Sequence, residues 1–346
     1  GLEGARLRLG FAATLQASDL LSFAKRALVG KKILYYPPSV PDVVYDPLME
    51  KRSILSREVK NELQVAFPGL EIKNLFSSLA EMRSIKSPAE IALLQKPIDA
   101  TVAAHVEAMK SCEPGMFEYE VQAVIEYCFS KNGAEYQGFP SIVGSGPNSC
   151  ILHYEANRRK MQDGDIVVMD IGAEFEGYSA DVTRTIPVNG TFSPAQREIY
   201  EIVLNANEES IKEFKPGASP GTPSQRAYDI IAEGLMKLGI IKIKDEARMY
   251  YMHGLSHHIG LDVHDPGPYG KPYAPGMILT NEPGIYVPEG SPCDKKYWNI
   301  GVRIEDDVLI TAEGNRVLSA GAPKSVTDIE SLMKKKGLGN VKIGEK

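Results

Sequence analysis

The sequence lacks several features that would assign it to a whole class of proteins. No apolar run approaches the roughly 18 to 20 residues that a membrane-spanning helix requires. Its four cysteines (Cys112, Cys128, Cys150 and Cys293) are widely separated and form no CxxC pair. This spacing indicates neither a zinc ribbon nor a disulfide framework. We expect reduced thiols in a cytoplasmic protein without a membrane partner.

Basic residues are also fewer than acidic residues. The chain has 39 lysines and arginines against 45 acidic residues, for a net charge of −6. This charge gives no electrostatic reason to expect a nucleic acid partner. The chain opens at Gly1 with neither a methionine nor a signal-peptide pattern, which is typical of a processed or truncated product. The 346 residues, 43% of them hydrophobic, suffice for a large domain with a smaller one attached.

The first 80 or so residues predict a small α/β unit. A short strand is expected at Lys32–Tyr36 and a helix at Ser56–Ala66. The run Ser87-Pro88-Ala89-Glu90 then combines a capping serine, a proline and a glutamate at the positions that open a helix. We therefore place a domain boundary between residues 86 and 87, and expect Pro97 to kink or interrupt the helix that follows.

The remainder of the chain is richer in strand-forming residues. Four strands are predicted, at Ile166–Phe175, Tyr178–Val188, Ile278–Val287 and Val302–Thr311. Two helices are predicted between them, from Ser193 to about Phe214 and from Pro223 to Leu238. We expect a catalytic domain over residues 87–325 and a tail over residues 326–346. The tail, rich in lysine and glycine, is expected to be solvated or frayed.

Histidine is rare, and its distribution is uneven. Five of the six histidines fall in two short segments, which contain His153, His253, His257, His258 and His264. Several imidazoles could therefore line one cleft. The sixth, His105, is expected on the surface of the first long helix.

Four acidic residues interrupt apolar, strand-like sequence: Asp170, Asp181, Glu282 and Glu305. A lone carboxylate inside such a strand would carry a large desolvation cost. Asp181 follows Asp170 by eleven positions across a turn at Gly177, so a hairpin could bring the two carboxylates together. Two carboxylates at close range repel each other unless a cation neutralises them.

An ion pair is the alternative for any one of these acids, with Arg303 or Arg184 as the partner. Four acids together with a histidine cluster favour a divalent-metal site, which needs hard oxygen ligands and one or two imidazoles. The neighbouring Asp306 and Asp307 are interpreted as hydrogen-bonding or solvated groups rather than ligands. His258 is interpreted as a structural residue.

The spaced motifs Asp170-x10-Asp181, HGLSHHIGLDVHD, NEPGIY and GVRIEDD resemble those of the metal-dependent pita-bread peptidases. Within that group the chain looks most like the aminopeptidase P (Xaa-Pro aminopeptidase) family, with prolidase as the alternative. The similarity covers about Ser87–Ser319. It implies an α+β pita-bread catalytic domain, preceded over residues 1–86 by a shortened α/β N-terminal domain.

The resemblance also implies roles for individual residues. It implies five metal ligands: Asp170, Asp181, His257, Glu282 and Glu305. Among them Asp181 and Glu305 would bridge two metal ions, and Glu282 would also act as the catalytic base. It further implies that His153, His253 and His264 line the pocket as catalytic residues that bind substrate and intermediate. Arg303 is expected to lie near Glu305 and to take part in substrate binding.

The implied cofactor is a pair of divalent metal ions, expected to be Mn²⁺, with Zn²⁺ or Co²⁺ as possible substitutes. A hydroxide bridging them would attack the carbonyl that precedes proline. The expected substrates are peptides with proline at position two, and the expected assembly is a homodimer. Prolidase, which cleaves only Xaa-Pro dipeptides, and a metal-free peptide-binding scaffold are the alternatives. Retention of all five ligand types argues against the scaffold.

Overall fold

A computed structural model describes residues 1–36 and 59–341. The chain separates into two compact units, Gly1–Leu79 and Ala80–Lys346. The assignment of residues 1–86 as part of a family N-terminal domain stays a prediction.

The first unit has few elements and a small core. Its elements are α1 (Leu2–Leu9), η1 (Ala17–Asp19), α2 (Leu20–Ala27), β1 (Ile33–Tyr36) and β2 (Glu71–Asn74). β1 and β2 pair in parallel, and their apolar residues pack around buried Leu28, Leu63 and Leu70. The predicted strand at Lys32–Tyr36 is confirmed. Residues 59–66 are helical as predicted, while residues 56–58 of that helix lie outside the described residues.

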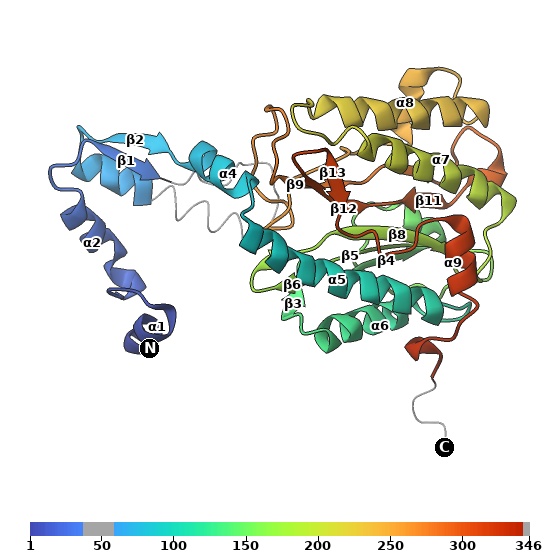
Figure 1. Cartoon of the computed structure of the whole chain (residues 1–346), viewed down its shortest axis with the longest axis horizontal. Coiled ribbons are helices and arrows are strands. Elements are labelled where there is room, and N and C mark those ends of the chain that lie inside the picture. The colour runs from blue at the N-terminus through green and yellow to red at the C-terminus, as the bar shows by residue number, and fades with distance from the viewer. Residues whose placement is uncertain (37–58, 342–346) are drawn as a thin grey trace. The chain divides into compact units, whose positions relative to one another are not determined.

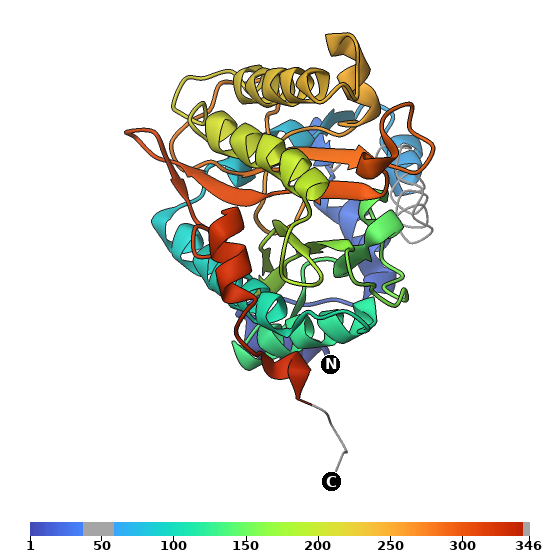
Figure 2. The same ribbon diagram turned by 90° about the vertical axis from the view of Figure 1, so that its right-hand side faces the viewer.

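The second unit contains most of the regular structure. Its helices are α5 (Pro88–Ser111), α6 (Glu118–Lys131), α7 (Pro194–Ile211), α8 (Gly221–Lys237) and α9 (Val326–Leu332), after α4 (Phe76–Ser84), which begins in the first unit. Its 3-10 turns are η2 (Gly146–Cys150), η3 (Lys244–Met249), η4 (Lys295–Tyr297) and η5 (Leu338–Asn340). Figures 1 and 2 show α5 and α6 on one side of the strands and α7 and α8 on the other.

Antiparallel strands lie between these helix pairs. They are β3 (Tyr136–Gln137), β4 (Ile142–Ser145), β5 (Ile166–Ile171), β6 (Ala173–Phe175), β7 (Tyr178–Ser179), β8 (Val182–Pro187), β9 (Ile278–Asn281), β10 (Gly284–Val287), β11 (Ile300–Arg303), β12 (Asp306–Ile310) and β13 (Asn315–Val317). They form four small sheets, ordered β4-β5-β8, β3-β6-β7, β13-β12-β9 and β10-β11. The predicted α+β class is confirmed.

The helix beginning at Ser87 follows the predicted capping box. Ser87 Oγ accepts a hydrogen bond from the backbone N–H of Glu90, and Glu90 Oε2 accepts one from the N–H of Ser87 at 2.8 Å. The predicted interruption at Pro97 is wrong, because α5 continues through this residue to Ser111. Pro97 is buried with its helix neighbours, and this packing maintains the helix despite the missing N–H.

Each of the four predicted strands is broken in two, which corrects the sequence-based prediction. The first breaks at Gly172, where a Cβ would lie only 1.9 Å from the carbonyl oxygen of Ala180. The next strand breaks at Ala180 and Asp181, between β7 and β8. The other two break at Glu282 and Glu305, and each half joins a different sheet. A carboxylate therefore lies at, or within two residues of, every break.

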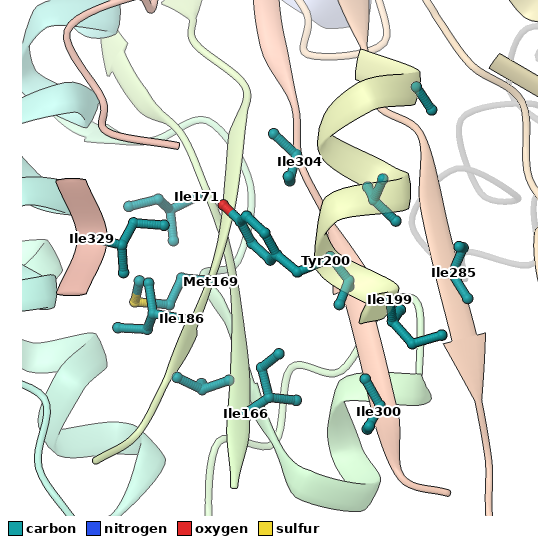
Figure 3. Close-up of a cluster of buried hydrophobic side chains, with 14 of the residues drawn as sticks. Ile166, Met169, Ile171, Ile186, Ile199, Tyr200, Ile285, Ile300, Ile304 and Ile329 are labelled. Atoms are coloured by element: carbon teal, nitrogen blue, oxygen red, sulfur yellow. The ribbon is translucent and has the colours of Figure 1, made fainter. Parts of the chain in front are cut away.

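The core fills the space between the strands and the helices. In Figure 3, Met169 and Ile171 of β5 and Ile186 of β8 lie near Ile329 of α9, and Tyr200 of α7 lies over the other side of the same strands. All five side chains are fully buried. This packing fixes β5 and β8, the strands that end beside Asp170 and Asp181.

As far as residue 341 the C-terminal tail is partly solvated, as expected, with Lys334, Lys335 and Lys336 exposed, and partly packed against the protein. α9 buries Val326 and Ile329. Further on, the backbone N–H of Gly339 donates to Ser111 Oγ at 2.9 Å, and Asn340 Nδ2 donates to the Ser111 carbonyl at 2.9 Å. Among the described residues, no helix combines the length and the apolar character needed to cross a membrane.

Candidate metal centre

The sequence-predicted site residues line a single cavity of about 370 Å³ in the second unit. Its lining includes all five predicted ligands and all three pocket histidines: Asp170, Asp181, His257, Glu282, Glu305, His153, His253 and His264. Arg303 lines it as well. Residues more than 150 positions apart in the sequence thus meet in one place.

The ligand candidates converge from the strand breaks and from one loop. Single ligand atoms of Asp181, His257 and Glu305 all lie within 4.8 Å of one another. His257 Nε2 is 3.3 Å from Asp181 Oδ2 and 3.7 Å from Glu282 Oε1. Because the backbone N–H of His257 donates to Thr280 Oγ1 at 3.1 Å, strand β9 fixes the loop that carries this imidazole.

Asp170 combines the two interpretations that the sequence left open. Its Oδ2 accepts a hydrogen bond from Arg303 Nη2 at 2.7 Å, so the predicted ion pair exists. Its Oδ1 is buried and has no hydrogen-bond partner among the described residues. An unpaired buried carboxylate oxygen is costly, and a cation in the cavity would satisfy it.

The carboxylates repel one another in the absence of a cation. Burial, together with the charges of Asp170, Asp307 and Glu282, raises the pKa of Asp181 well above its ordinary value. Burial and the neighbouring Asp181 do the same to the pKa of Glu305. Burial raises the pKa of Glu282 to about 7. Clustered acids with raised pKa values are typical of sites that bind positive charge.

This donor set fits divalent cations. It offers carboxylate oxygens and one imidazole, the combination that manganese and zinc accept in proteins. The bare oxygen of Asp170 and the short separations among Asp181, His257 and Glu305 leave ligand atoms facing a common space. The five predicted ligands could therefore hold such ions, and their individual roles stay predictions.

The pocket histidines differ in how firmly they are held. His253 Nδ1 contacts the Gly254 carbonyl at 2.8 Å, and its Nε2 contacts Tyr286 Oη at 2.8 Å. Both ring nitrogens are therefore occupied, and burial and Arg303 lower the pKa of His253 to about 4. His264 stands edge-on to His257 with ring centroids 4.3 Å apart, and burial lowers its pKa to about 4.

Comparison with known proteins agrees with this geometry. A profile of metallopeptidase family M24 matches residues 92–312. The chain is 40% identical over 347 residues to the Xaa-Pro aminopeptidase of Escherichia coli, covering 96% of this chain and 77% of that protein. It is 46% identical over 274 residues to that of Haemophilus influenzae, covering 76% of this chain and 64% of that protein.

The chain belongs to metallopeptidase family M24.

Solved structures support the same assignment. Zn-substituted aminopeptidase P of Escherichia coli in complex with product matches with a TM-score of 0.84 at 39% identity, covering 96% of this chain and 78% of that one. A variant of that enzyme in complex with substrate matches with a TM-score of 0.83. The predicted family and the pita-bread fold are confirmed, and this M24 peptidase is a metal-dependent enzyme.

A second group of buried charges lies behind the cavity of the M24 peptidase. Arg184 Nη2 is 2.7 Å from Asp306 Oδ1, and Lys324 Nζ is 2.8 Å from Asp306 Oδ2. Arg184 Nη1 also donates to the Glu305 carbonyl at 2.6 Å. Burial alone would raise the pKa of Asp306, but Arg184 and Lys324 lower it below its ordinary value. This network holds the backbone of one ligand candidate.

Asp306 and Asp307 are both fully buried, so the solvated interpretation is wrong and the hydrogen-bonding one is confirmed. Asp307 Oδ2 accepts from the backbone N–H of Asp181 at 3.2 Å, while Asp307 Oδ1 has no hydrogen-bond partner in residues 1–36 and 59–341. Burial raises the pKa of Asp307 to about 8. His258 lies outside the residues that line the main cavity, with its backbone bridged to Asp265 and Leu279.

The expectation for His105 is wrong. It is fully buried on α5, and its Nε2 contacts the Val182 carbonyl at 2.9 Å. Burial, with a contribution from Arg184, lowers its pKa to about 3. Helical spacing carried the signal, because Ile98, Thr101 and His105 lie at intervals of three and four on the buried face.

Two further residues contact the site that sequence reasoning did not place there. Thr183 Oγ1 donates to Glu305 Oε2 at 2.6 Å, and alternation along a strand puts Thr183 on the face of Asp181. Tyr286 Oη joins His253 to Arg303, which donates to it at 2.9 Å. Tyr286 is fully buried and does not line the cavity itself.

Proposed function

We propose that this M24 peptidase is an Xaa-Pro aminopeptidase, which releases the first residue of peptides whose second residue is proline. The observation that carries the proposal is the cavity in which the five predicted acid and imidazole ligands meet, in a chain 40% identical to an Xaa-Pro aminopeptidase. Asp170, Asp181, His257, Glu282 and Glu305 would hold two divalent ions, with Mn²⁺ expected.

Divalent ions at such a site lower the pKa of a bound water and polarise a peptide carbonyl. Within the chain, Glu282 is suited to accept the proton of the attacking water and return it to the leaving proline nitrogen. It lines the cavity with a partly exposed carboxylate, and its Oε2 lies 3.7 Å from His253 Nδ1. A general base must be within reach of the proton that it moves, and Glu282 is placed at the cavity wall for that purpose.

The pocket histidines have different roles in the proposed reaction. His153 and His264 line the cavity and make no hydrogen bond within the described chain, so their ring nitrogens are free for substrate. Both ring nitrogens of His253 already make hydrogen bonds within the protein. Its ring therefore lines the cavity in a fixed orientation and does not serve as a flexible hydrogen-bond donor. Arg303 neutralises Asp170 and, through Tyr286, fixes His253.

The test is a cleavage assay on manganese-loaded protein. It compares an Xaa-Pro dipeptide, an Xaa-Pro-Xaa tripeptide and an Xaa-Ala-Xaa control, each with and without a chelator. Chelator-sensitive release of the first residue from the proline tripeptide, with the alanine control intact, is the expected result. Turnover of the dipeptide alone would mean prolidase activity, and no turnover with any metal would overturn the proposal.

Two finer features belong to the proposal and need separate measurements. Metal analysis of the purified protein, with activity after reloading by Mn²⁺, Zn²⁺ or Co²⁺, checks the expected two Mn²⁺ ions per chain. Light scattering during size-exclusion chromatography checks the expected homodimer. A single ion per chain or a monomeric mass would contradict these parts of the proposal while leaving the reaction itself untouched.

A further inference from the structure

We propose that Glu118 is a positioning residue for His153, which it places by anchoring both sides of the loop that carries this histidine. The inference rests on the proposed function, since it concerns the cavity where the peptide would bind. Glu118 is fully buried at the start of α6 and does not line the cavity.

One carboxylate collects five hydrogen bonds from this loop. Glu118 Oε1 accepts from the Ser145 N–H at 2.8 Å, from Ser145 Oγ at 2.7 Å and from Asn148 Nδ2 at 3.1 Å. Its Oε2 accepts from Tyr154 Oη at 2.8 Å and from the Arg159 N–H at 2.8 Å. These donors lie before and after His153 in the sequence, so Glu118 ties together both ends of the segment that carries it.

The segment lacks regular secondary structure, and a second anchor after His153 is buried Asn157, which accepts from the Val143 N–H at 3.0 Å and donates to the Ser141 carbonyl at 2.7 Å. Beyond η2, residues 151–159 form no helix or strand. His153 itself makes no hydrogen bond within the described chain, so the position of its ring depends on the anchored backbone. A buried carboxylate is costly unless its oxygens are fully bonded, and the five donors provide that bonding.

The same loop touches the candidate metal centre. The Leu152 carbonyl faces Arg303 Nη2 at 3.4 Å, and Arg303 in turn binds Asp170. The Gly301 N–H donates to Ser149 Oγ at 2.8 Å, and a Cβ at Gly301 would lie 2.0 Å from the Ser149 carbonyl oxygen. The loop therefore lies directly against β11, and a shift in it would move groups that face the substrate.

Helix capping does not explain the burial of Glu118. Two positions later, Glu120 Oε2 accepts from the Phe117 N–H at 2.6 Å and caps the same helix. Glu120 is exposed, whereas Glu118 is fully buried and directs its oxygens at the loop. The two glutamates on one helical turn thus provide a matched pair for experiment.

Glu118→Gln is the sharpest change. An ionised carboxylate only accepts hydrogen bonds, whereas an amide replaces one acceptor oxygen with a donor group. The amide that this change introduces would face donors from the loop, and at least one side of the anchor would be lost. Glu120→Gln is the control, since it alters the same helical turn without touching residues 145–159.

The experiment is a double-mutant cycle on the full chain loaded with manganese. Glu118→Gln, His153→Ala, the double variant and Glu120→Gln are assayed for kcat and KM on an Xaa-Pro-Xaa peptide. We expect a loss of about 10-fold or more in kcat/KM for Glu118→Gln, as for other supporting residues of metal sites. The double variant should be no worse than His153→Ala alone, and Glu120→Gln should stay within about 2-fold of the parent.

Losses that multiply in the double variant would overturn the proposal, because Glu118 would then act independently of His153. Parent-like kinetics for Glu118→Gln would overturn it as well. If Glu118→Gln does not fold, Tyr154→Phe removes a single anchor, and its smaller loss should likewise vanish in the His153→Ala background. A Tyr154→Phe loss that persists there would overturn the proposal.

A second measurement does not depend on activity. Hydrogen–deuterium exchange should rise in peptides covering residues 146–156 of Glu118→Gln, and stay unchanged there in Glu120→Gln. An unchanged rate in Glu118→Gln would overturn the positioning role. If the parent enzyme cleaves no proline peptide, the proposed function is contradicted. If its Glu118→Gln variant still shows faster exchange in residues 146–156, the anchoring of the loop by Glu118 is supported all the same.

Discussion

Buried acids in two neighbouring parts of this protein have pKa values that shift in opposite directions. Asp306 contacts Arg184 and Lys324, and these cations lower its pKa below the ordinary value despite its complete burial. Asp181 and Glu305 line the cavity, where burial and mutual repulsion raise their pKa values well above the ordinary range.

The difference identifies the place where a cation is required. Around Asp306 the chain supplies its own positive charge, so the network is complete without a ligand. Around Asp181 and Glu305 the excess of negative charge is left for bound ions to neutralise. The network around Asp306 is structural and the cavity acids are poised for a cofactor, although Asp306, Asp181 and Glu305 are all buried.

The largest effect is expected for a substitution among the acids that line the cavity. Asp181→Asn removes a candidate ligand, so we expect the peptidase activity to fall at least about 100-fold, beyond the loss typical of supporting residues. The same change removes repulsion, so the metal-free protein should gain stability. Steady-state assays and urea unfolding check the two outcomes, with exposed Asp245→Asn as the control. Retained activity would show that Asp181 is not a ligand.

The next largest effect is expected for a substitution in the network around Asp306. Arg184→Leu leaves Asp306 buried without its main partner, and we expect a loss of about 3–5 kcal/mol in the free energy of unfolding. The control is Arg197→Leu, whose ion pair with Glu201 is exposed and should contribute no more than about 0.5 kcal/mol. Urea unfolding of the manganese-loaded protein provides both values. Equal losses would remove the distinction between buried and exposed pairs.

The pH dependence of the free energy of unfolding tests the same difference between the acids. Acids with raised pKa values bind protons more tightly in the folded protein, so the stability that this provides is complete below about pH 4 and is lost as the pH rises through the folded pKa. For Asp307 that value is about 8. The metal-free protein should therefore lose about 1–3 kcal/mol in the free energy of unfolding between pH 7 and pH 8.

His253 and His264 do not obscure this window, because their lowered pKa values keep both neutral above pH 7 in the folded state. Bound Mn²⁺ should flatten the dependence by neutralising the cavity acids. Thermal unfolding in buffers of matched ionic strength measures it. A metal-free protein that is as stable at pH 8 as at pH 7 would contradict the repulsion.

The smallest expected effect is at Lys324, the outer partner of Asp306. Its side chain is 22% exposed, and its ammonium also donates to Asn207 Oδ1 at 2.7 Å. Because solvent reaches this group and Arg184 remains in place, Lys324→Met should cost about 1 kcal/mol in the free energy of unfolding. Chemical denaturation beside Arg184→Leu tests the order, and a larger loss for Lys324→Met would reverse the assignment of the main partner.

Local sequence patterns predicted the chemical character of the site and much of the local structure. The capping boxes at Ser87 and Ser193 began helices at the predicted positions, because a cap depends on neighbours within one turn. The acids inside apolar sequence and the clustered histidines indicated a metal site for a similar reason. A charged group among apolar residues needs a partner wherever the chain folds.

The positions of the strand breaks, and which acids have a cationic partner, depend instead on tertiary contacts. The break at Gly172 depends on the Ala180 carbonyl across the hairpin, and the pairing of Arg184 with Asp306 joins residues 122 positions apart. The contact of His105 Nε2 with the Val182 carbonyl likewise joins residues 77 positions apart. Such features arise from close contacts between distant segments, and no local pattern of the sequence encodes the distance at which two of them meet.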